Sequence, residues 1–430
     1  MTDPSPDARL RRLLAEHEEK VRSILGKAVS PMPARPSDPV GDPRENGGRS
    51  ILVISPDLPP STGHPTSGAG LRAWGLAEGL RSRGHEVTLA VPDTTADAIE
   101  WKGDRGAVIF PGHDLDRFVR DRGPDVVVFQ HWLLAGELRG DYRHTVIDLH
   151  GPLLLETLFR QGAEVAELFD RKVEAFSRAH FFTCAGERQK QYFFAWLLLA
   201  GFDLRRAPIE VVRFSLPPEP PVHEYPCEPE FVFGGHFLPW QNPALGLEVL
   251  VQELESGDQG HLWLFGSYHS WVETGSLPAF ERVRRLLGSS GRATVSPALN
   301  RADLIERYRK MSVAWDLMPY NCERGMAFTS RTAEYLWAGL PVVHQRYAEL
   351  SELISTYEAG WLVDPDDPEA IRRVVRRILS NPEEIRLRGR NAQALARDWL
   401  DWSRTVDPLD AFVRDPDHKR GRRFDERNEV

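Results

Sequence analysis

Short apolar runs alternate with segments of helical periodicity along the chain from residue 51 onward. The runs before residue 217 are "ILVIS" (51), "EVTLAV" (86), "AVIF" (107), "DVVVFQ" (125), "TVIDL" (145), "HFFTC" (180) and "IEVV" (209). Strands that are apolar at nearly every position and separated by helices are typical of a parallel sheet covered on both faces. This half of the chain therefore predicts an α/β domain.

A proline-rich break, "PPEPPVHEYPCEP" at 217–229, interrupts the alternation before it restarts. The later runs are "EFVFGG" (230), "HLWLFG" (261), "ATVS" (293), "VAWDLMP" (313), "PVVH" (341) and "WLV" (361). We therefore predict two doubly wound, Rossmann-like domains facing a cleft, at 50–220 and 221–400. The helical pattern from about 381 to 413 is long enough to cross back onto the first domain, and 401–430 hold the end of this crossing and a charged tail.

The N-terminal part, residues 1–49, differs from the rest. Residues 7–26 place leucines and a valine on one stripe among charges, which predicts an amphipathic helix. The segment 29–49 holds five prolines and three glycines and is expected to be a linker. Two interpretations of the helix stay open: it mediates a homodimer, or it docks on its own body.

Composition excludes several classes of protein. The formal net charge of -9 argues against nucleic acid as a partner. Three scattered cysteines, Cys184, Cys227 and Cys322, form no disulfide or zinc pattern, so we expect no metal. Without a signal peptide or a run that could span a bilayer, we expect a cytoplasmic protein. The apolar segment 192–202 has two interpretations, burial in the core, which we favour, or peripheral contact with the inner face of a membrane.

The loop after the first strand is a candidate site. Gly68 and Gly70 precede a helix that starts near Leu71, an arrangement in which a helix N-terminus meets an anion or a sugar hydroxyl. The glycines lack the spacing of a dinucleotide-binding fingerprint. Taken alone, a tight turn with a solvated Arg72 explains the stretch equally well.

Two histidines follow strands directly: His131 after "DVVVFQ" and His150 after "TVIDL". Ligands of open α/β sheets bind outside the carboxyl ends of the strands, so both positions face the predicted cleft. A neutral imidazole there can bind a sugar hydroxyl or a phosphate, and Gly151 leaves room beside His150. For His131, which precedes the bulky Trp132, a structural role explains the position equally well.

The stretch "SRTAEYLWAGLPVV" at 330–343 predicts a helix that carries chemistry. Thr329 or Ser330 can cap it, and Gly339 is placed to end it. Amides at its start can receive a phosphate, Arg331 adds charge, and Glu334 can accept two vicinal hydroxyls. The alternative is an exposed Arg–Glu pair on a surface helix, which contributes little to stability.

Several stretches together resemble the GT-B glycosyltransferases of glycosyltransferase family 4, over nearly all of residues 51–400. They are "SGAGLRAWGLAEGLRSRGHEVTL", "TVIDLHG", "CERGMAFTSRTAEYLWAGLPVV" and "ELSELISTYEAGWLVDPDDPEAI", and "FFTCAGERQKQYFFAWLLLAG" resembles a surface-polysaccharide branch. The resemblance implies the GT-B fold, with an acceptor domain at 50–220 and a nucleotide-sugar donor domain at 221–400. It also implies retaining, metal-independent transfer of a sugar from a nucleoside-diphosphate sugar, in which the leaving phosphate helps to deprotonate the acceptor hydroxyl.

Position by position, the resemblance assigns roles to residues of this chain. Glu334 matches the acid that binds the nucleotide ribose, and His150 matches the histidine near the donor sugar and phosphate. The loop that meets the donor diphosphate and acceptor corresponds to Gly68, Ala69 and Gly70. We add Ser330 at the donor, and Arg72 and His131 at the acceptor.

The chain departs from the family pattern at two places. The family's Arg and Lys after the first strand of the second domain are replaced by His236 and Gln241. Loss of both cations would weaken stabilisation of the leaving diphosphate by several kcal/mol unless other groups replace them.

We expect Arg324 and Arg331 to replace the lost cations. The first acid of the family's glutamate pair is replaced by Met326, and Glu323, three residues earlier, is our candidate for its role. The expected catalytic residues are therefore His150 and Glu323.

Three hypotheses follow for the function. The first is a retaining glycosyltransferase that acts on a glycan, a glycolipid or a natural product. The second is a non-catalytic GT-B partner or activator, which the missing cations favour. The third is a GT-B enzyme with another nucleotide-sugar chemistry.

Overall fold

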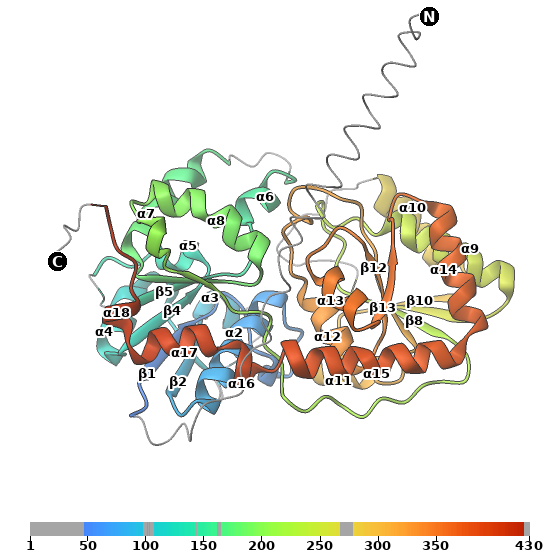
Figure 1. Cartoon of the computed structure of the whole chain (residues 1–430), viewed down its shortest axis with the longest axis horizontal. Coiled ribbons are helices and arrows are strands. Elements are labelled where there is room, and N and C mark those ends of the chain that lie inside the picture. Colours follow the sequence, from blue (N-terminus) through green and yellow to red (C-terminus); the bar gives the residue numbers. More distant parts are fainter. Residues whose placement is uncertain are drawn as a thin grey trace, which may run out of the picture. The chain divides into compact units, whose positions relative to one another are not determined.

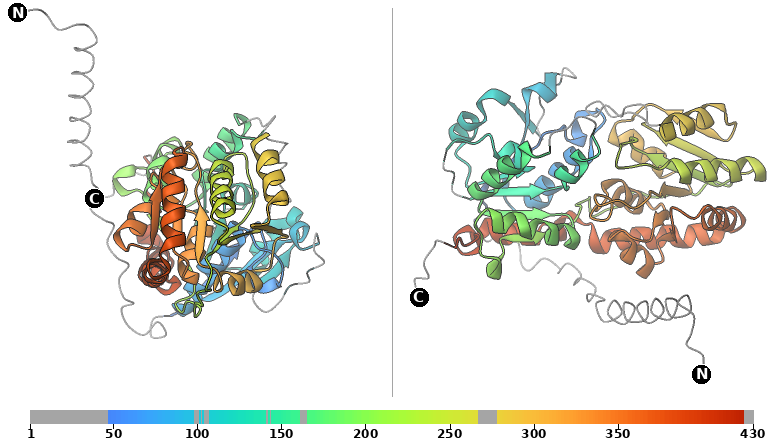
Figure 2. Two further views of the ribbon diagram at one scale, coloured as in Figure 1. Left: turned by 90° about the vertical axis from the view of Figure 1, so that its right-hand side faces the viewer. Right: turned by 90° about the horizontal axis from the view of Figure 1, so that it is seen from above.

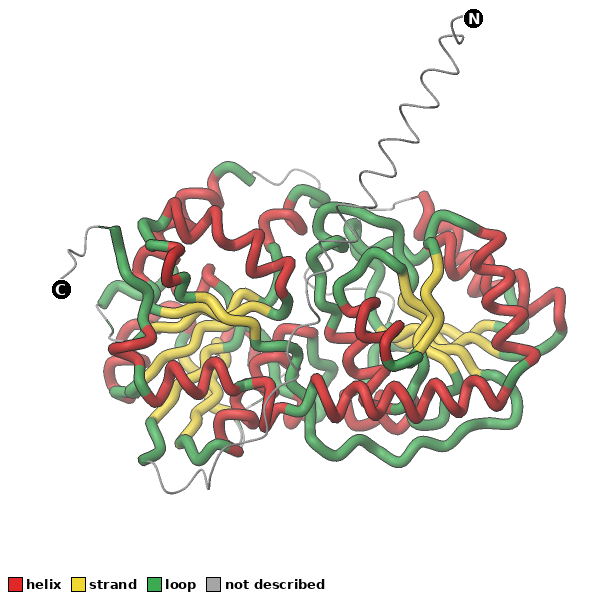
Figure 3. The backbone as a smooth tube through the Cα atoms, viewed as in Figure 1, coloured by secondary structure: helices red, strands yellow, loops and turns green. Residues whose placement is uncertain are grey.

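The computed structural model describes residues 47–97, 101, 103, 107–140, 142, 144–160, 165–266 and 278–424. The predicted N-terminal helix at 7–26 and most of the linker at 29–49 lie outside the described residues. Within the described part, every run predicted as a strand forms one. The strands form two parallel sheets, which Figures 1 and 3 show side by side with helices around them.

The first sheet has seven strands in the order β3-β2-β1-β4-β5-β6-β7. With the helices and turns around it, this sheet is called the first lobe. Its strands are β1 (Ser50–Ile54), β2 (Glu86–Pro92), β3 (Ala107–Phe110), β4 (Val126–Gln130), β5 (Thr145–Leu149), β6 (Phe181–Cys184) and β7 (Ile209–Val211). Its helices are α2 (Gly68–Ser82), α3 (Asp93–Asp97), α4 (Leu115–Arg122), α5 (Trp132–Ala135), α6 (Leu153–Thr157), α7 (Glu167–Arg178) and α8 (Glu187–Leu199), with short turns η1 (Pro60–Thr62), η2 (Gly112–Asp114) and η3 (Leu204–Arg206).

The second sheet has six strands in the order β10-β9-β8-β11-β12-β13 and forms the second lobe. The strands are β8 (Glu230–Gly234), β9 (His261–Phe265), β10 (Ala293–Ser296), β11 (Val313–Asp316), β12 (Val342–Gln345) and β13 (Gly360–Val363). The helices are α9 (Ala244–Gly257), α10 (Pro278–Ser289), α11 (Arg301–Tyr308), α12 (Ser330–Ala338), α13 (Leu350–Thr356), α14 (Pro368–Ser380) and α15 (Pro382–Trp399).

The last helices run from the second lobe back to the first. They are α15, α16 (Trp402–Thr405), α17 (Asp407–Arg414) and α18 (Pro416–Lys419), drawn in red in Figures 1 and 2. The ring of Phe412 on α17 stacks on Phe181 of β6 with centroids 4.5 Å apart. The imidazole of His85 lies 2.6 Å from the Asp410 carboxylate. The end of the chain is thus part of the first lobe's core.

The apolar segment 192–202 divides between core and surface. It forms the end of α8, where Phe193 and Leu197 are buried while Leu198 and Leu199 are exposed. Among the described residues, no helix combines the length and apolar character needed to cross a membrane.

A buried ion pair, rather than a surface cation, is found at Arg72. Its Nε and Nη2 donate to the two carboxylate oxygens of Asp148 at 2.6 and 2.7 Å, and Nη2 also donates to the Val212 carbonyl. Thr183 donates to the same carboxylate. Arg72 and Asp148 are both fully buried, so the pair joins α2 to β5 inside the first lobe. The predicted acceptor role of Arg72 is therefore wrong, because its guanidinium is buried in the core and paired with Asp148.

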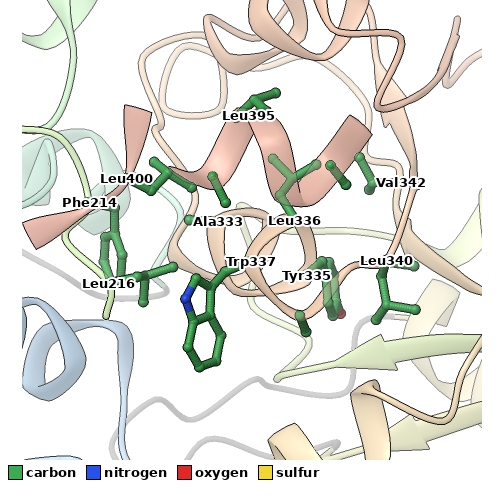
Figure 4. Close-up of a cluster of buried hydrophobic side chains, with 14 of the residues drawn as sticks. Phe214, Leu216, Ala333, Tyr335, Leu336, Trp337, Leu340, Val342, Leu395 and Leu400 are labelled. Atoms are coloured by element: carbon green, nitrogen blue, oxygen red, sulfur yellow. The ribbon is translucent and has the colours of Figure 1, made fainter. Parts of the chain in front are cut away.

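A cluster of buried side chains packs α12 against α15 and against the chain that joins the lobes. Leu336 and Leu340 from the α12 region meet Leu395 and Leu400 near α15, and Phe214 and Leu216 come from the connection between the sheets (Figure 4). Since α12 carries several of the predicted site residues, this cluster fixes their position.

We predict that Leu336→Ala lowers the free energy of unfolding by about 2–5 kcal/mol, because the side chain is fully buried and its loss leaves a cavity. Urea unfolding followed by circular dichroism measures the change. The matched control is Leu387→Ala on α15, where the side chain is 48% exposed and a change of about 0.5 kcal/mol or less is expected. Equal losses in both variants would contradict the assigned packing.

Candidate functional site

A cavity of about 370 Å³ lies between the carboxyl ends of the two sheets. The first lobe contributes the start of α2 and the segment from His150 to Arg160. The second lobe contributes the loop after β8, part of α11, and the loop and first turn of α12. Most of the predicted site residues line it: Gly68, Ala69, His150, His236, Gln241, Glu323, Arg324, Ser330, Arg331 and Glu334.

Helix α12 begins at the cavity, near the predicted position. Thr329 occupies the N-cap position, but its hydroxyl donates to Thr332 Oγ1 at 2.6 Å instead of capping the helix. The amides of the first turn are therefore not occupied by the N-cap side chain. Gly339 ends the helix with a φ of 89°, a left-handed conformation that glycine adopts without strain.

Glu334 lies one turn into α12 and is paired with a cation that the sequence did not indicate. Its Oε1 accepts from Arg301 Nε at 2.8 Å, while Oε2 accepts no hydrogen bond from the described residues. Burial raises the pKa of Glu334, and the Arg301 charge opposes that rise. The Arg301 guanidinium lies 5.0 Å from the ring of Trp74, on the first lobe, and 5.1 Å from that of Trp337. Cation–π contacts with these two rings thus position the guanidinium that donates to Glu334.

Arg331 reaches from α12 to the loop after β8. Its Nη1 donates to the Gly234 carbonyl at 3.1 Å and its Nη2 donates to Gln241 Oε1 at 2.8 Å. Its Nε lies 3.4 Å from Asp316 Oδ1. The guanidinium therefore lies against the loop that holds His236 and Gln241, the residues that stand where the resemblance leads us to expect two cations.

The Arg331 guanidinium packs so close to Gly235 that a side chain at this position would not fit. Its φ is 130°, and a Cβ there would lie 2.6 Å from Arg331 Nη1. Any larger residue would be strained and would push the guanidinium out of place.

Glu323 and Arg324 form a second buried pair. Arg324 donates through Nη2 to Glu323 Oε1 at 2.7 Å and through Nε to the other oxygen. Asn321 Oδ1 accepts from both main-chain amides, which fixes the loop. Both side chains line the cavity, whereas Met326 is not among the lining residues, so it does not fill the space.

His150 and Gly68 bring the first lobe close to α12. A Cβ on Gly68 would lie 2.7 Å from Ser330 Oγ and 3.5 Å from His150 Nε2, so a larger residue would require the Ser330 side chain to shift. The His150 Nδ1 is buried and accepts or donates no hydrogen bond among the described residues. Burial, and secondarily the Arg72 charge, lowers the pKa of His150 to about 4. The imidazole is therefore neutral at pH 7.

Three of the predicted site residues lie away from the cavity lining. Gly70 is packed against the main chain, since a Cβ there would lie 2.1 Å from the Leu58 carbonyl oxygen. Arg72 is the core residue described above. His131 has a φ of 94° and caps α5 by accepting from the Leu133 amide, which is the structural alternative that its sequence context left open. These positions are corrected to structural roles.

The α2 amides are also less available than expected. Ser67 Oγ accepts from the amides of Ala69 and Gly70 at 3.1 and 3.3 Å, so this side chain occupies two donors of the helix N-terminus. A ligand that meets this loop would therefore contact the Gly68 surface rather than those amides.

Among the lining residues that the sequence did not indicate are Glu156, Arg160 and Trp240. Burial raises the pKa of Glu156 to about 7, the Glu323 charge adds to the rise, and Arg324 and Arg160 oppose it. Arg160 lies 5.6 Å from the ring of Trp240, a contact between the lobes. The only signal available was that Glu156 follows the strand-end His150 by six residues.

The two lobes also meet beside the cavity. Glu349, directly before α13, accepts from the amides of Glu187 and Arg188 at 2.9 and 3.0 Å, so a carboxylate of the second lobe caps the N-terminus of α8. Arg188 donates to the Gly325 carbonyl at 3.1 Å. The loop that carries Glu323 and Arg324 is thereby tied to the first lobe.

We predict that the imidazole of His150 stays neutral down to about pH 5. Because its folded-state pKa is below the unfolded value of about 6.5, His150 contributes stability at pH 7 that is lost as the pH falls from about 6.5 towards 4. Histidine NMR titration, with the resonance assigned by difference from His150→Gln, measures the midpoint. A midpoint near 6.5 would contradict the burial described here.

Residues 222–395 match the family model described as "Glycosyl transferases group 1". No curated protein matches the sequence.

Solved structures resemble the chain over most of its length. Sucrose-phosphate synthase from Thermosynechococcus elongatus is 15% identical, with 85% of this chain and 98% of that chain covered and a TM-score of 0.61. HepE of Anabaena in complex with UDP is 14% identical, with 85% and 99% covered and a TM-score of 0.60. WaaG, a glycosyltransferase involved in lipopolysaccharide biosynthesis, is 14% identical, with 84% and 99% covered and a TM-score of 0.56.

At these low identities the solved structures establish only the fold. The family model matches residues of the second lobe. The predicted pair of Rossmann-like domains is confirmed as the GT-B arrangement. The stretch around Glu334 and Arg331 lies inside the matched region. The chain thus has the GT-B fold, and its residues 222–395 match the model of the glycosyl transferases group 1.

Proposed function

We propose that this protein is a retaining glycosyltransferase that moves a sugar from a nucleoside-diphosphate sugar to a hydroxyl of an acceptor. One observation carries the proposal: a carboxylate and a guanidinium of the second lobe converge with a first-lobe histidine in one cavity, as Glu334, Arg331 and His150. Membership of glycosyltransferase family 4 and a product that is a polysaccharide, a glycolipid or a natural-product glycoside are parts of the proposal.

The ribose would bind at Glu334. Its Oε1 already accepts from Arg301, and a carboxylate oxygen carries two acceptor sites, so Oε1 and Oε2 together can still receive two vicinal hydroxyls. Burial raises the pKa of Glu334, and the Arg301 charge opposes that rise, which favours the charged form of the carboxylate. A charged acceptor binds a hydroxyl more strongly than a neutral one does.

The diphosphate would bind at the start of α12. Helix amides and the positive end of the helix dipole favour an anion there. Arg331 adds a fixed guanidinium, held by the Gly234 carbonyl and by Gln241. This supports Arg331 as the replacement for the cations missing at His236 and Gln241. Arg324 is a weaker replacement, because its Nε and Nη2 already donate to the Glu323 carboxylate.

The sugar would lie between the diphosphate and the first lobe. A neutral His150 can donate one hydrogen bond and accept another, which suits a sugar hydroxyl or a phosphate oxygen. Glu323 and Arg324 would contact sugar hydroxyls on the opposite side. The retaining course and the independence from metal are taken from the resemblance to family 4.

The proposal also includes the acceptor and the location of the protein. The acceptor is a hydroxyl-bearing glycan, glycolipid or small molecule, not a nucleic acid. A cytoplasmic location, with peripheral membrane contact and a homodimer as open alternatives, stays a prediction.

A non-catalytic GT-B partner is the second candidate, and the loss of the Arg and Lys favours it. Two observations count against it. The cavity is open rather than filled by Met326, and Arg331 lies where a substitute cation is needed.

We expect one nucleoside diphosphate of UDP, GDP, dTDP, ADP and CDP to raise the melting temperature, and Glu334→Gln to abolish most of this rise. Glutamine keeps an acceptor for Arg301 but loses the charge that binds ribose. The control is Glu383→Gln on the surface of α15, where the side chain is 79% exposed. Thermal-shift titration measures the effect, since a ligand that binds only the folded state stabilises it.

Transfer itself is tested with the matching nucleoside-diphosphate glucose, by following release of the nucleotide. Binding without release with any sugar or alcohol acceptor would favour the partner protein. No binding of any nucleotide would contradict the proposal.

Arg331→Met should weaken binding of the nucleoside diphosphate by about 1.5–3 kcal/mol, roughly 10- to 100-fold, because a charged donor to phosphate is lost. Isothermal titration measures the affinity. Arg307→Met on the exposed face of α11 is the matched control and should bind normally. Unchanged affinity in Arg331→Met would contradict the proposal that Arg331 binds the diphosphate.

A further inference from the structure

The carboxylate proposed to bind ribose depends on a residue that is not among the cavity-lining residues, Arg301 at the first position of α11. Its Nε donates to Glu334 Oε1 at 2.8 Å, and no other cation of the described residues lies within ion-pair distance of that carboxylate. The Arg301 side chain is 12% exposed. Arg301 is thus placed to act on a ligand through Glu334 rather than by contact.

The bond to Glu334 does not satisfy the whole guanidinium. Arg301 Nη2 is buried and donates no hydrogen bond to any described residue. A buried donor without a partner costs free energy unless other contacts compensate. Two aromatic rings supply such contacts, since the guanidinium lies 5.0 Å from the ring of Trp74 and 5.1 Å from that of Trp337. The rings therefore help to keep Arg301 beside Glu334.

The two rings belong to different lobes, and each is held in place. The indole Nε1 of Trp337, on α12, donates at 2.8 Å to the carbonyl of Pro217, in the connection between the sheets. The ring of Trp74, on α2 of the first lobe, meets the ring of Trp402 edge-on, with centroids 5.2 Å apart. The surroundings of Arg301 are therefore built from both lobes.

The position of Arg301 matters for Glu334 because this carboxylate is buried. Burial raises the pKa of Glu334, and the Arg301 charge opposes that rise. Without Arg301 the carboxyl group would keep its proton to a higher pH, and a neutral carboxyl group accepts a hydrogen bond more weakly than a carboxylate does. Ribose binding at Glu334 therefore requires Arg301 in this position.

We propose that Arg301 is a positioning residue for the donor ribose and that Trp74 of the first lobe completes its binding site on the protein. Arg301 makes and breaks no bond during transfer, but it fixes the orientation and the charge of Glu334. The ribose site of the second lobe is then complete only with a side chain from the first lobe. This inference rests on the proposed function.

The test measures how strongly the protein prefers a nucleoside diphosphate over its 2′,3′-dideoxy analogue. The nucleotide is the one of UDP, GDP, dTDP, ADP and CDP that stabilises the wild type, and isothermal titration gives both affinities. The wild type should prefer the hydroxylated nucleotide by about 10-fold or more, because a charged acceptor receives the ribose hydroxyls. This preference, the ratio of the two affinities, cancels the contribution of the diphosphate, which both ligands carry.

Arg301→Met should lower the ratio at least about 5-fold at pH 7. Its affinity for the dideoxy analogue should stay at the wild-type value, which shows that the variant has folded. Arg301→Lys keeps the charge but not the planar group, so it should give an intermediate ratio. The matched control is Arg307→Met, on the exposed face of the same helix, which should keep the wild-type ratio.

Trp74→Leu tests the contribution of the first lobe. It should lower the ratio about 2- to 5-fold, because one of the two ring contacts of Arg301 is lost. Trp74 is not among the cavity-lining residues, so a direct contact with the nucleotide would not explain this loss. The control is Trp196→Leu on α8, a partly buried tryptophan of the same lobe, which should leave the ratio unchanged.

The pH dependence separates positioning from packing. The titratable groups of the described residues that face Glu334 are Arg301 and Tyr308, both on α11, and burial raises the pKa of Tyr308 well above its ordinary value, so it stays neutral. In Arg301→Met the ratio should therefore rise with pH towards the wild-type value, as Glu334 loses its proton. The same rise should occur at lower pH in the wild type. A low ratio that does not change with pH would contradict the proposal.

The possible failures are distinct. An Arg301→Met variant with the wild-type ratio at every pH overturns the role of Arg301 and leaves the proposed function standing. A Trp74→Leu variant with the wild-type ratio overturns the contribution of the first lobe. A wild-type ratio near 1 contradicts ribose binding at Glu334, on which this inference rests. A wild-type protein that binds none of the nucleotides overturns the proposed function and this inference together.

Discussion

The contact of Arg331 with the loop after β8 is the interaction on which the account of the cavity depends. A guanidinium in a partly closed site must be paired, because its desolvation otherwise costs several kcal/mol. Arg331 meets this demand with the Gly234 carbonyl, the Gln241 side chain and Asp316, and Gly235 leaves the space it needs. The same contacts hold the charge against the loop at which the resemblance leads us to expect two cations.

The other charged side chains around the cavity are also paired. Arg301 is held between two tryptophan rings, one from each lobe, and in turn holds Glu334. Glu323 and Arg324 satisfy one another, and Glu349 of the second lobe caps α8 of the first. These pairs fix the positions of the charged side chains on both sides of the cleft and across it.

Much of the fold could be predicted because its signals are local. Apolar strands, a proline-rich break and the glycine that ends α12 are all visible in short stretches, and the carboxyl ends of parallel strands meet at one edge. Glu334, Arg331 and His150 line the cavity as predicted for that reason, while their roles stay predictions. The expectation for His131 failed because a strand-end position does not reveal where a side chain points. The expectation for Arg72 failed because its buried ion pair with Asp148 is a contact over 76 positions of the sequence.

The groups that were missed are also products of long-range contacts. Arg301 reaches Glu334 across 33 positions, and its aromatic neighbours come from both lobes. Glu156 comes near Glu323 and Arg324 of the second lobe, which only the assembled cavity shows. Sequence patterns identify groups that belong to one element, whereas the pairing of charges between elements needs the three-dimensional arrangement.

In the proposed function, the donor nucleotide binds at α12 between Glu334 and Arg331. A crystal structure of the protein with the nucleoside diphosphate that binds it tests this most directly. We expect ribose hydroxyls on the Glu334 carboxylate and phosphate oxygens at Arg331 and the first-turn amides of α12. A nucleotide bound elsewhere, with Glu334 and Arg331 in contact only with protein, would contradict it.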